Sequence, residues 1–190
     1  MHVAVVYESL FGSTHEIAEA IAAGITDARP DAAIDLMRVG EADPDQAARA
    51  GLLVVGGPTH MRGMTRAMSR KLGLSIEGKK TPDATHDVHD PEPGAEGPGV
   101  RDWLHRLPKA GLGHTAAAFD TRLANRMAGG AAHGIARRLR RAGYRLITDP
   151  EGFIVEDAEG PLRAGERERA RSWAADLVRQ LQGAASGGLR

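Results

Sequence analysis

The stretch MHVAVVYESLFGSTHEIAEAIAAGI, residues 1–25, decides the fold. Its apolar run from Val3 to Val6 is typical of a strand, and from Ile17 onward the apolar residues recur at the spacing of one helix face. Between the two patterns lies a short segment of hydroxyl-bearing residues and a glycine. We therefore predict a strand over about residues 2–7, a tight loop, and a helix over about residues 13–28.

The loop before this helix suits a phosphate group. The first turn of a helix has unpaired backbone N–H groups and carries the positive end of the helix dipole. Ser9, Ser13 and Thr14 add hydroxyl donors, and no Lys or Arg lies in the loop, so we expect neutral donors to hold the phosphate. This favours a retained phosphate monoester over phosphoryl transfer, which normally uses a lysine and a metal ion. The alternative is an ordinary turn in which Ser13 or Thr14 caps the helix.

The segment from Tyr7 to Thr14 resembles the phosphate loop of flavodoxin-like proteins, [ST]-x-x-G-x-T, with Ser9, Gly12 and Thr14 at the motif positions. The resemblance extends over nearly the whole chain and implies that flavin mononucleotide (FMN) binds at this loop. Phe11 stands where many flavodoxins have another hydroxyl, so more of the phosphate contacts fall to backbone amides. The phosphate-loop residues that the resemblance implies are Ser9, Leu10, Phe11, Gly12, Ser13 and Thr14.

Strand and helix signals alternate along the chain, which predicts an α/β fold with a parallel sheet. Their order fits a flavodoxin-like, doubly wound sheet of five parallel strands (order 2-1-3-4-5) in a three-layer sandwich, with the ligand site beyond the carboxyl ends of strands one and three. Further strands are predicted over about 34–39, 52–55, 114–119 and 144–155, the last being either two strands or one strand broken at Asp149–Pro150. Further helices are predicted over about 44–49, 100–107, 131–142 and 166–181, with a weaker pattern over 65–74.

Domain organisation is predicted to be simple. The 190 residues fit a single domain over residues 1–183, followed by a flexible tail over 184–190. An irregular inserted segment over about residues 76–99, rich in Pro, Gly, Asp and His, is either functional or mobile. Within it, His86–Asp90 has two histidines beside carboxylates, but nothing fixes a tetrahedral arrangement, so we favour a polar loop and predict no metal site.

The loop after the third strand is the second candidate flavin contact. Its two glycines let the backbone approach a flat ring closely, and Thr59 and neighbouring amides suit the polar edge of the ring. The resemblance implies that this loop packs against the flavin ring. His60 or Met61 occupies the position at which flavodoxins commonly have an aromatic residue. Arg62 is either a cation that eases flavin reduction or a solvated surface arginine. The predicted contacts here are Pro58, Thr59, His60, Met61, Arg62 and Gly63.

The loop after the fourth strand is the third candidate contact, with Asp120, Thr121 and Arg122. Thr121 and the amides up to Gly130 suit the polar edge of the flavin, whereas for Asp120 we favour a structural role, as a cap or as a partner of Arg122. Farther along, Arg137–Arg141 is a dense basic run. We favour a solvated helix face for this run over a dock for an acidic redox partner or a dinucleotide phosphate.

Composition excludes several classes of protein. Lys plus Arg equals Asp plus Glu at 25 each, which argues against a general nucleic-acid binder and differs from the strongly acidic electron-shuttling flavodoxins. The chain has no cysteine, which excludes disulfides, thiolate catalysis and Cys-ligated clusters. No apolar stretch is long enough to span a membrane, so we expect a cytoplasmic protein.

The predicted function is therefore that of an FMN-binding flavodoxin-like redox protein, which transfers electrons through a non-covalently bound flavin. No acid–base dyad or nucleophile stands out, so we name no catalytic residue. The expected partner is a redox protein or a small quinone-like substrate. One alternative is an FMN-dependent reductase or oxidase acting on a quinone- or porphyrinogen-like substrate, which the balanced charge and the 76–99 segment favour. A second is a flavin-free interaction module on the same scaffold.

Overall fold

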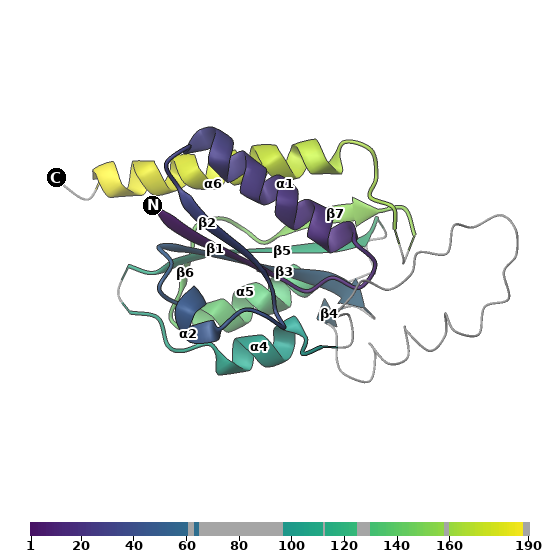
Figure 1. The fold of residues 1–190 in the computed structure, drawn as a ribbon, viewed down its shortest axis with the longest axis horizontal. Coiled ribbons are helices and arrows are strands. Elements are labelled where there is room, and N and C mark those ends of the chain that lie inside the picture. Colours follow the sequence, from purple (N-terminus) through teal and green to yellow (C-terminus); the bar gives the residue numbers. More distant parts are fainter. Residues whose placement is uncertain (61–62, 65–96, 112, 125–129, 158–159, 188–190) are drawn as a thin grey trace, which may run out of the picture.

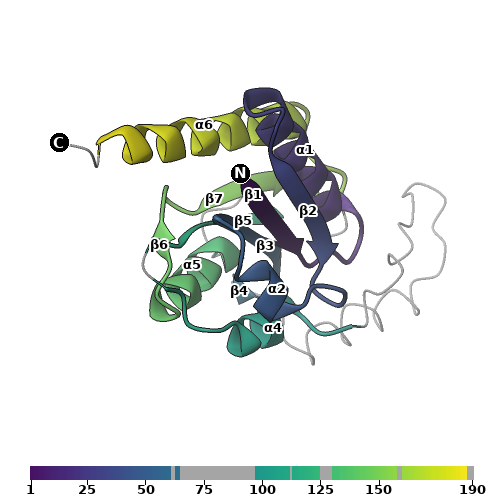
Figure 2. The same ribbon diagram turned by 60° about the vertical axis from the view of Figure 1, so that its left-hand side comes forward.

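The computed structural model describes residues 1–60, 63–64, 97–111, 113–124, 130–157 and 160–187. A central sheet lies between two layers of helices (Figure 1). Helices α1 (Ser13–Ala28) and α6 (Glu166–Gly187) cover one face of the sheet. Helices α4 (Val100–Arg106) and α5 (Ala131–Arg141), with the short α2 (Pro44–Ala47), cover the other face, as a rotated view also shows (Figure 2). The predicted three-layer α/β sandwich is therefore confirmed.

The sheet has the predicted parallel order. Its strands are β1 (His2–Tyr7), β2 (Ala33–Arg38), β3 (Leu52–His60), β5 (Thr115–Leu123), β6 (Arg145–Leu146) and β7 (Glu151–Val155), and its main path runs β2-β1-β3-β5-β6. Both β6 and β7 pair in parallel with β5, β6 at its start and β7 at its end. The outermost position is thus one strand interrupted around Asp149–Pro150, which gives the five-position order 2-1-3-4-5. A short β4 (Gly63–Met64), which the sequence did not predict, pairs antiparallel with β3.

Two central strands are longer than predicted. β3 continues from Val55 to His60, and β5 continues from Phe119 to Leu123. The two strands stay paired over this extension, with Gly56 opposite Phe119 and Pro58 opposite Thr121. A Cβ atom on Gly56 would overlap the Phe119 ring, so glycine is required in the strand at this point.

This extension corrects the prediction that Asp120, Thr121 and Arg122 form a loop, and the prediction that Pro58 and Thr59 do so: all five residues lie in strands. Gly-Gly-Pro is a strong local turn signal, but pairing with the neighbouring strand overrides it.

Other boundaries differ slightly from the predictions. α4 ends at Arg106, because Leu107 precedes a proline and takes an extended conformation. α6 was expected to end near residue 181 but continues to Gly187, so part of the predicted tail is helical. Residues 65–74 and most of the predicted insertion lie outside the described residues.

The apolar core is divided by the sheet. Val3 and Val5 face α1 and α6, whereas Ala4 and Val6 face α4 and α5, and all four are fully buried. Both faces of the sheet are covered, which explains why the central strands are apolar at consecutive positions. The edge strand β2 is only partly buried, in keeping with its alternating sequence. Among the described helices, none is both long and apolar enough to cross a membrane.

Candidate functional site

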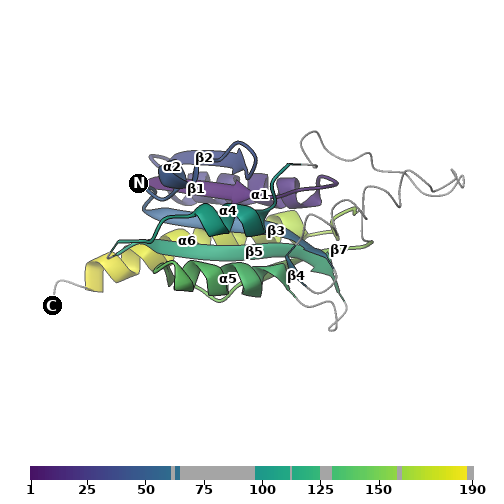
Figure 3. The same cartoon turned by 90° about the horizontal axis from the view of Figure 1, so that it is seen from below.

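The candidate site lies at the edge of the sheet where β1, β3 and β5 end, and where their connections to the helices begin (Figure 3). Strand order reverses between β1 and β3, because the chain moves outward from β1 to β2 and then returns to β3 on the other side. At such a point the two following loops diverge to opposite faces of the sheet and leave room for a ligand.

The first loop is held in a fixed conformation. Gly12 is the N-cap of α1 with φ of 94°, a value that residues with a side chain rarely adopt. Its N–H donates to the Ser9 hydroxyl at 3.2 Å. Ser9, Leu10, Ser13 and Thr14 are buried, whereas Phe11 is partly exposed. The six predicted phosphate-loop residues therefore form one short, constrained turn at the start of α1.

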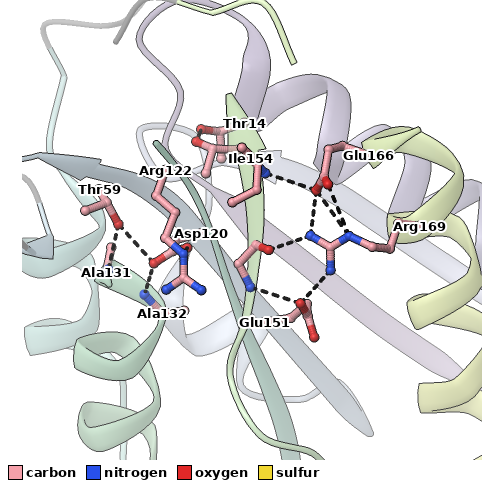
Figure 4. A network of polar contacts seen from close by, with 12 residues as sticks. Thr14, Thr59, Asp120, Arg122, Ala131, Ala132, Glu151, Ile154, Glu166 and Arg169 are labelled. Atoms are coloured by element: carbon pink, nitrogen blue, oxygen red, sulfur yellow. Dashed lines mark hydrogen bonds and ion pairs between the residues drawn. The ribbon is translucent and has the colours of Figure 1, made fainter. Parts of the chain in front are cut away.

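Two buried hydroxyls meet between the first and third loops. The Thr14 and Thr121 oxygens lie 2.7 Å apart, and the pair joins α1 to β5 (Figure 4). A hydroxyl pair uses one of its two hydrogens for the mutual bond, so the second hydrogen is left to donate elsewhere. The loop thus supplies a donor in addition to the first amides of α1.

A segment that the sequence did not point to lies against the same loop. Gly160 follows β7, and a Cβ atom placed on it would lie 2.8 Å from the Ser13 hydroxyl oxygen. Its φ of 111° also favours glycine. No motif marks Gly160 in the sequence; the long-range approach of the chain after β7 makes it a neighbour of the first loop.

A cation from another strand also lies against this loop, whereas the loop's own sequence contains none. Arg38, the last residue of β2, donates a hydrogen bond of 3.5 Å from Nη1 to the Ser9 carbonyl oxygen. Its guanidinium carbon lies 5.6 Å from the centre of the Tyr7 ring, and His15 stacks against the same ring at a centroid distance of 5.2 Å. Arg38 lies opposite Tyr7 in the β1–β2 pairing, and this register places its charge beside Ser9, a residue 29 positions earlier in the chain.

The second and third candidate segments are joined by Asp120. Its carboxylate is fully buried and accepts hydrogen bonds of 2.9 Å from the Thr59 hydroxyl and from the Ala132 N–H (Figure 4). Thr59 in turn accepts from the Ala131 N–H at 2.8 Å. Both side chains therefore satisfy amides at the start of α5, whose own N-cap residue, Gly130, contributes no side chain.

Burial raises the pKa of the Asp120 carboxyl, while the hydrogen bond from the Ala132 amide and the charge of Arg122 act in the opposite direction. The Arg122 Nε lies 3.8 Å from Asp120 Oδ1, which accepts no hydrogen bond from the described residues. Arg122 extends across Gly152 of β7, where any side chain would overlap the guanidinium. The structural role favoured for Asp120 thus agrees with these contacts, and Arg122 is its ion-pair partner.

A second buried carboxylate lies beside the first loop. Glu8 follows β1 directly and accepts a hydrogen bond of 2.8 Å from the Val100 N–H, the first amide of α4. Sequence reasoning did not select Glu8 for this role, because Val100 is 92 residues away along the chain. The contact fixes the position of α4 relative to the site edge.

Farther along β7, Arg169 of α6 fixes the position of the strand. It bonds Glu151 at 2.6 Å and both Glu166 and the Gly152 carbonyl oxygen at 2.5 Å, and Glu166 also accepts from the Ile154 N–H (Figure 4). These contacts hold the strand that lies beneath Arg122.

The structure describes only some of the remaining residues predicted to contact the flavin. His60 ends β3 and Gly63 begins β4, while Met61 and Arg62 lie outside the described residues. The predicted ring-facing side chain of the second loop therefore stays a prediction. The His86–Asp90 segment also lies outside, and the residues that the structure does describe form no group of three or more His, Asp or Glu suited to a metal ion.

Solved structures with a similar fold are numerous. An archaeal flavodoxin aligns with a TM-score of 0.62 and 18% identity, covering 96% of this chain and 99% of its own. Oxidised flavodoxin 2 from Bacillus cereus aligns with a TM-score of 0.62 and 17% identity, covering 95% and 99%. This chain has the flavodoxin-like fold. A flavodoxin from Streptococcus pneumoniae TIGR4 gives a TM-score of 0.61 at 15% identity, covering 95% and 99%.

At these identities the likeness concerns the flavodoxin-like fold alone. No family model matches the sequence, and no curated protein matches it. What the site binds must therefore be argued from its own residues.

Proposed function

We propose that the chain binds FMN non-covalently at the β1–β3–β5 edge and acts as an electron-transfer protein. The observation that carries the proposal is the first loop. Gly12, with its positive φ, and the Thr14–Thr121 hydroxyl pair lie at the start of α1, beside the switch point of the sheet. Helix amides, hydroxyl donors and a nearby arginine suit a phosphate monoester. A cytoplasmic location is part of the same proposal.

Different residues of the site have different roles in this proposal. Residues 9–14 and Arg38 hold the phosphate, while Pro58 and Thr59, at the end of β3, bound the planar ring on one side. Thr121 offers a hydroxyl, and Asp120 with Arg122 keeps β5 and α5 in position. FMN, when bound, would supply the one- and two-electron chemistry.

The proposal is tested by titrating the purified protein with FMN and, separately, with riboflavin, while recording visible absorption and flavin fluorescence. We expect perturbed flavin bands and tighter binding of FMN than of riboflavin. Absence of binding to either compound would leave the flavin-free module. Equal affinity for both would contradict a phosphate site at the first loop.

An anaerobic reductive titration then separates the two redox alternatives. Accumulation of a species reduced by one electron favours the carrier, and direct passage to the two-electron level favours the reductase.

Replacing Thr14 by Val is expected to weaken FMN binding about fivefold to tenfold, because the variant removes one donor without changing side-chain volume. Riboflavin affinity should change less than twofold. Isothermal titration of both compounds measures the difference. A parallel loss of affinity for both would instead indicate that Thr14 acts through the packing of the loop.

Replacing Arg38 by Gln is expected to weaken FMN binding about tenfold, because a charge-assisted contact with the phosphate is removed. Arg49→Gln is the matched control, since Arg49 is exposed near the end of α2 and the variant makes the same change in net charge. Raised salt should reduce the effect of Arg38→Gln. If Arg49→Gln weakened FMN as much, the effect would be one of general charge.

A further inference from the structure

The balanced net charge of the chain conceals an uneven distribution. Residues 1–60 contain nine Asp or Glu and three Arg, whereas residues 97–149 contain ten Lys or Arg and three Asp. Exposed acidic side chains gather around α2, as in Glu41, Asp43 and Asp45. The basic segment contains α4 and α5, which lie side by side on the face of the sheet opposite α1 and α6 (Figures 1 and 3).

Cationic side chains of α4, α5 and the turn after α4 lie near one another, and we name this group the α4–α5 basic face. Its members are Arg101, His105, Lys109, Arg137, Arg138 and Arg141.

Two contacts link α5 to α4 and to the turn after α4. Arg138 Nη1 lies 3.0 Å from His105 Nε2, and Lys109 Nζ donates to the Arg141 carbonyl oxygen at 2.6 Å. Partial burial, together with the charges of Arg101, Arg137 and Arg141, lowers the pKa of Arg138, while the charge of Asp102 acts in the opposite direction. The fold therefore holds like charges close together on this face.

The two faces of the sheet differ in how their arginines are neutralised. On α6, Arg167 pairs with Glu16 at 3.5 Å, and Arg171 and Arg179 pair with Asp27 and Asp176. On α5, no carboxylate of the described residues forms an ion pair with Arg137, Arg138 or Arg141. Asp102 of α4 is the one carboxylate among the described residues that acts on Arg138 at longer range, and three arginines oppose it. Surface cations that outnumber the nearby carboxylates in this way favour association with an acidic surface.

The basic face lies close to the candidate site, because both use α5. The helix begins at the amides bonded by Thr59 and Asp120. Arg138 is six residues beyond Ala132, a rise of roughly 9 Å along the helix axis. A partner seated on α4 and α5 would therefore rest on the same helix whose first amides belong to the site, although the basic side chains lie toward the other end of that helix.

We propose that the α4–α5 basic face docks an acidic protein that presents clustered Asp and Glu side chains. A protein is favoured over a nucleic acid because the basic surface is confined to two short helices, while the acidic groups around α2 would repel a long polyanion. The role of this docking, exchange of electrons, rests on the proposed function, but the docking itself requires no flavin. The partner would have the opposite charge to one that suits an acidic flavodoxin.

The test uses the full chain without flavin and, as probe, a fluorescent peptide containing about eight consecutive glutamates, at low salt, where surface charges are least screened. We expect binding by fluorescence anisotropy, and NMR shift changes on α4 and α5. The variant Arg137→Gln/Arg138→Gln/Arg141→Gln should weaken binding about tenfold and reduce its salt dependence. The matched variant Arg167→Gln/Arg171→Gln/Arg179→Gln changes the net charge equally on the other face and should stay within about twofold.

Five outcomes would overturn the proposal, four of them in the binding experiments. These four are no binding of the peptide at low salt, equal weakening in the two triple variants, shift changes located away from α4 and α5, and tighter binding of a DNA duplex than of the peptide to the same face. Self-association that the α5 triple variant abolishes would assign the face to a second copy of the chain and would likewise contradict it. Because flavin is absent throughout, none of these outcomes bears on FMN binding.

Discussion

Asp120→Ala is expected to lower the free energy of unfolding by roughly 3 kcal/mol, since it leaves the Thr59 hydroxyl and the Ala132 amide without their buried acceptor. Asp120→Asn keeps an acceptor oxygen for both groups and removes a buried charge, so we expect it to retain most of the stability. Urea unfolding near neutral pH measures both effects. Asp149→Ala, which removes an exposed carboxylate, is the control and should change stability by less than about 0.5 kcal/mol.

The same pair of proteins gives a pH-dependent prediction. The folded-state pKa of Asp120 is raised above its ordinary value of 3.8, chiefly by burial. The stability associated with this carboxyl is therefore complete below that ordinary value and is lost as the pH rises through the raised folded-state pKa.

Asp120→Asn cannot ionise, so its stability relative to the wild type should increase as the pH rises from about 4 to about 8. Urea unfolding of both proteins across that range gives the difference directly. A difference that is constant or that falls with pH would show that the carboxyl is stabilised in its charged form.

Gly24→Ala is expected to destabilise the fold by roughly 1–3 kcal/mol, although alanine is the better helix former. A Cβ atom on Gly24 of α1 would overlap the carbonyl oxygen of Arg171 in α6, so the two helices would have to separate. Because the obstacle is backbone, no side-chain rotation relieves it. Thermal or urea unfolding gives the magnitude.

Gly183→Ala in α6 is the matched control for this substitution. Gly183 is also helical, but it is exposed and a Cβ atom there would meet nothing within 4 Å. We expect this change to stabilise the protein by roughly 0.5–1 kcal/mol. Effects of the same sign at both positions would refute the close approach of α1 to α6.

The sequence by itself determined the order of strands and helices, and with it the sheet topology. Continuous apolar runs such as residues 52–55 mark strands that are covered on both faces, and the periodic apolar residues from Ile17 to Ile25 mark a covering helix. These signals are local, and the preference for short, right-handed connections between parallel strands then fixes the order of the strands in the sheet. The first loop was predicted for the same reason, since its glycine and hydroxyls are consecutive in the chain.

Tertiary structure alone decided which distant groups meet at the site. Pairing of β3 with β5 turned the predicted loops at Pro58 and Asp120 into strands. The register of β2 against β1 brought Arg38 to Ser9. These contacts join residues far apart in the sequence, and their energies depend on strand register and on burial. No local pattern encodes either, so a reader of the sequence sees the site residues but not their partners.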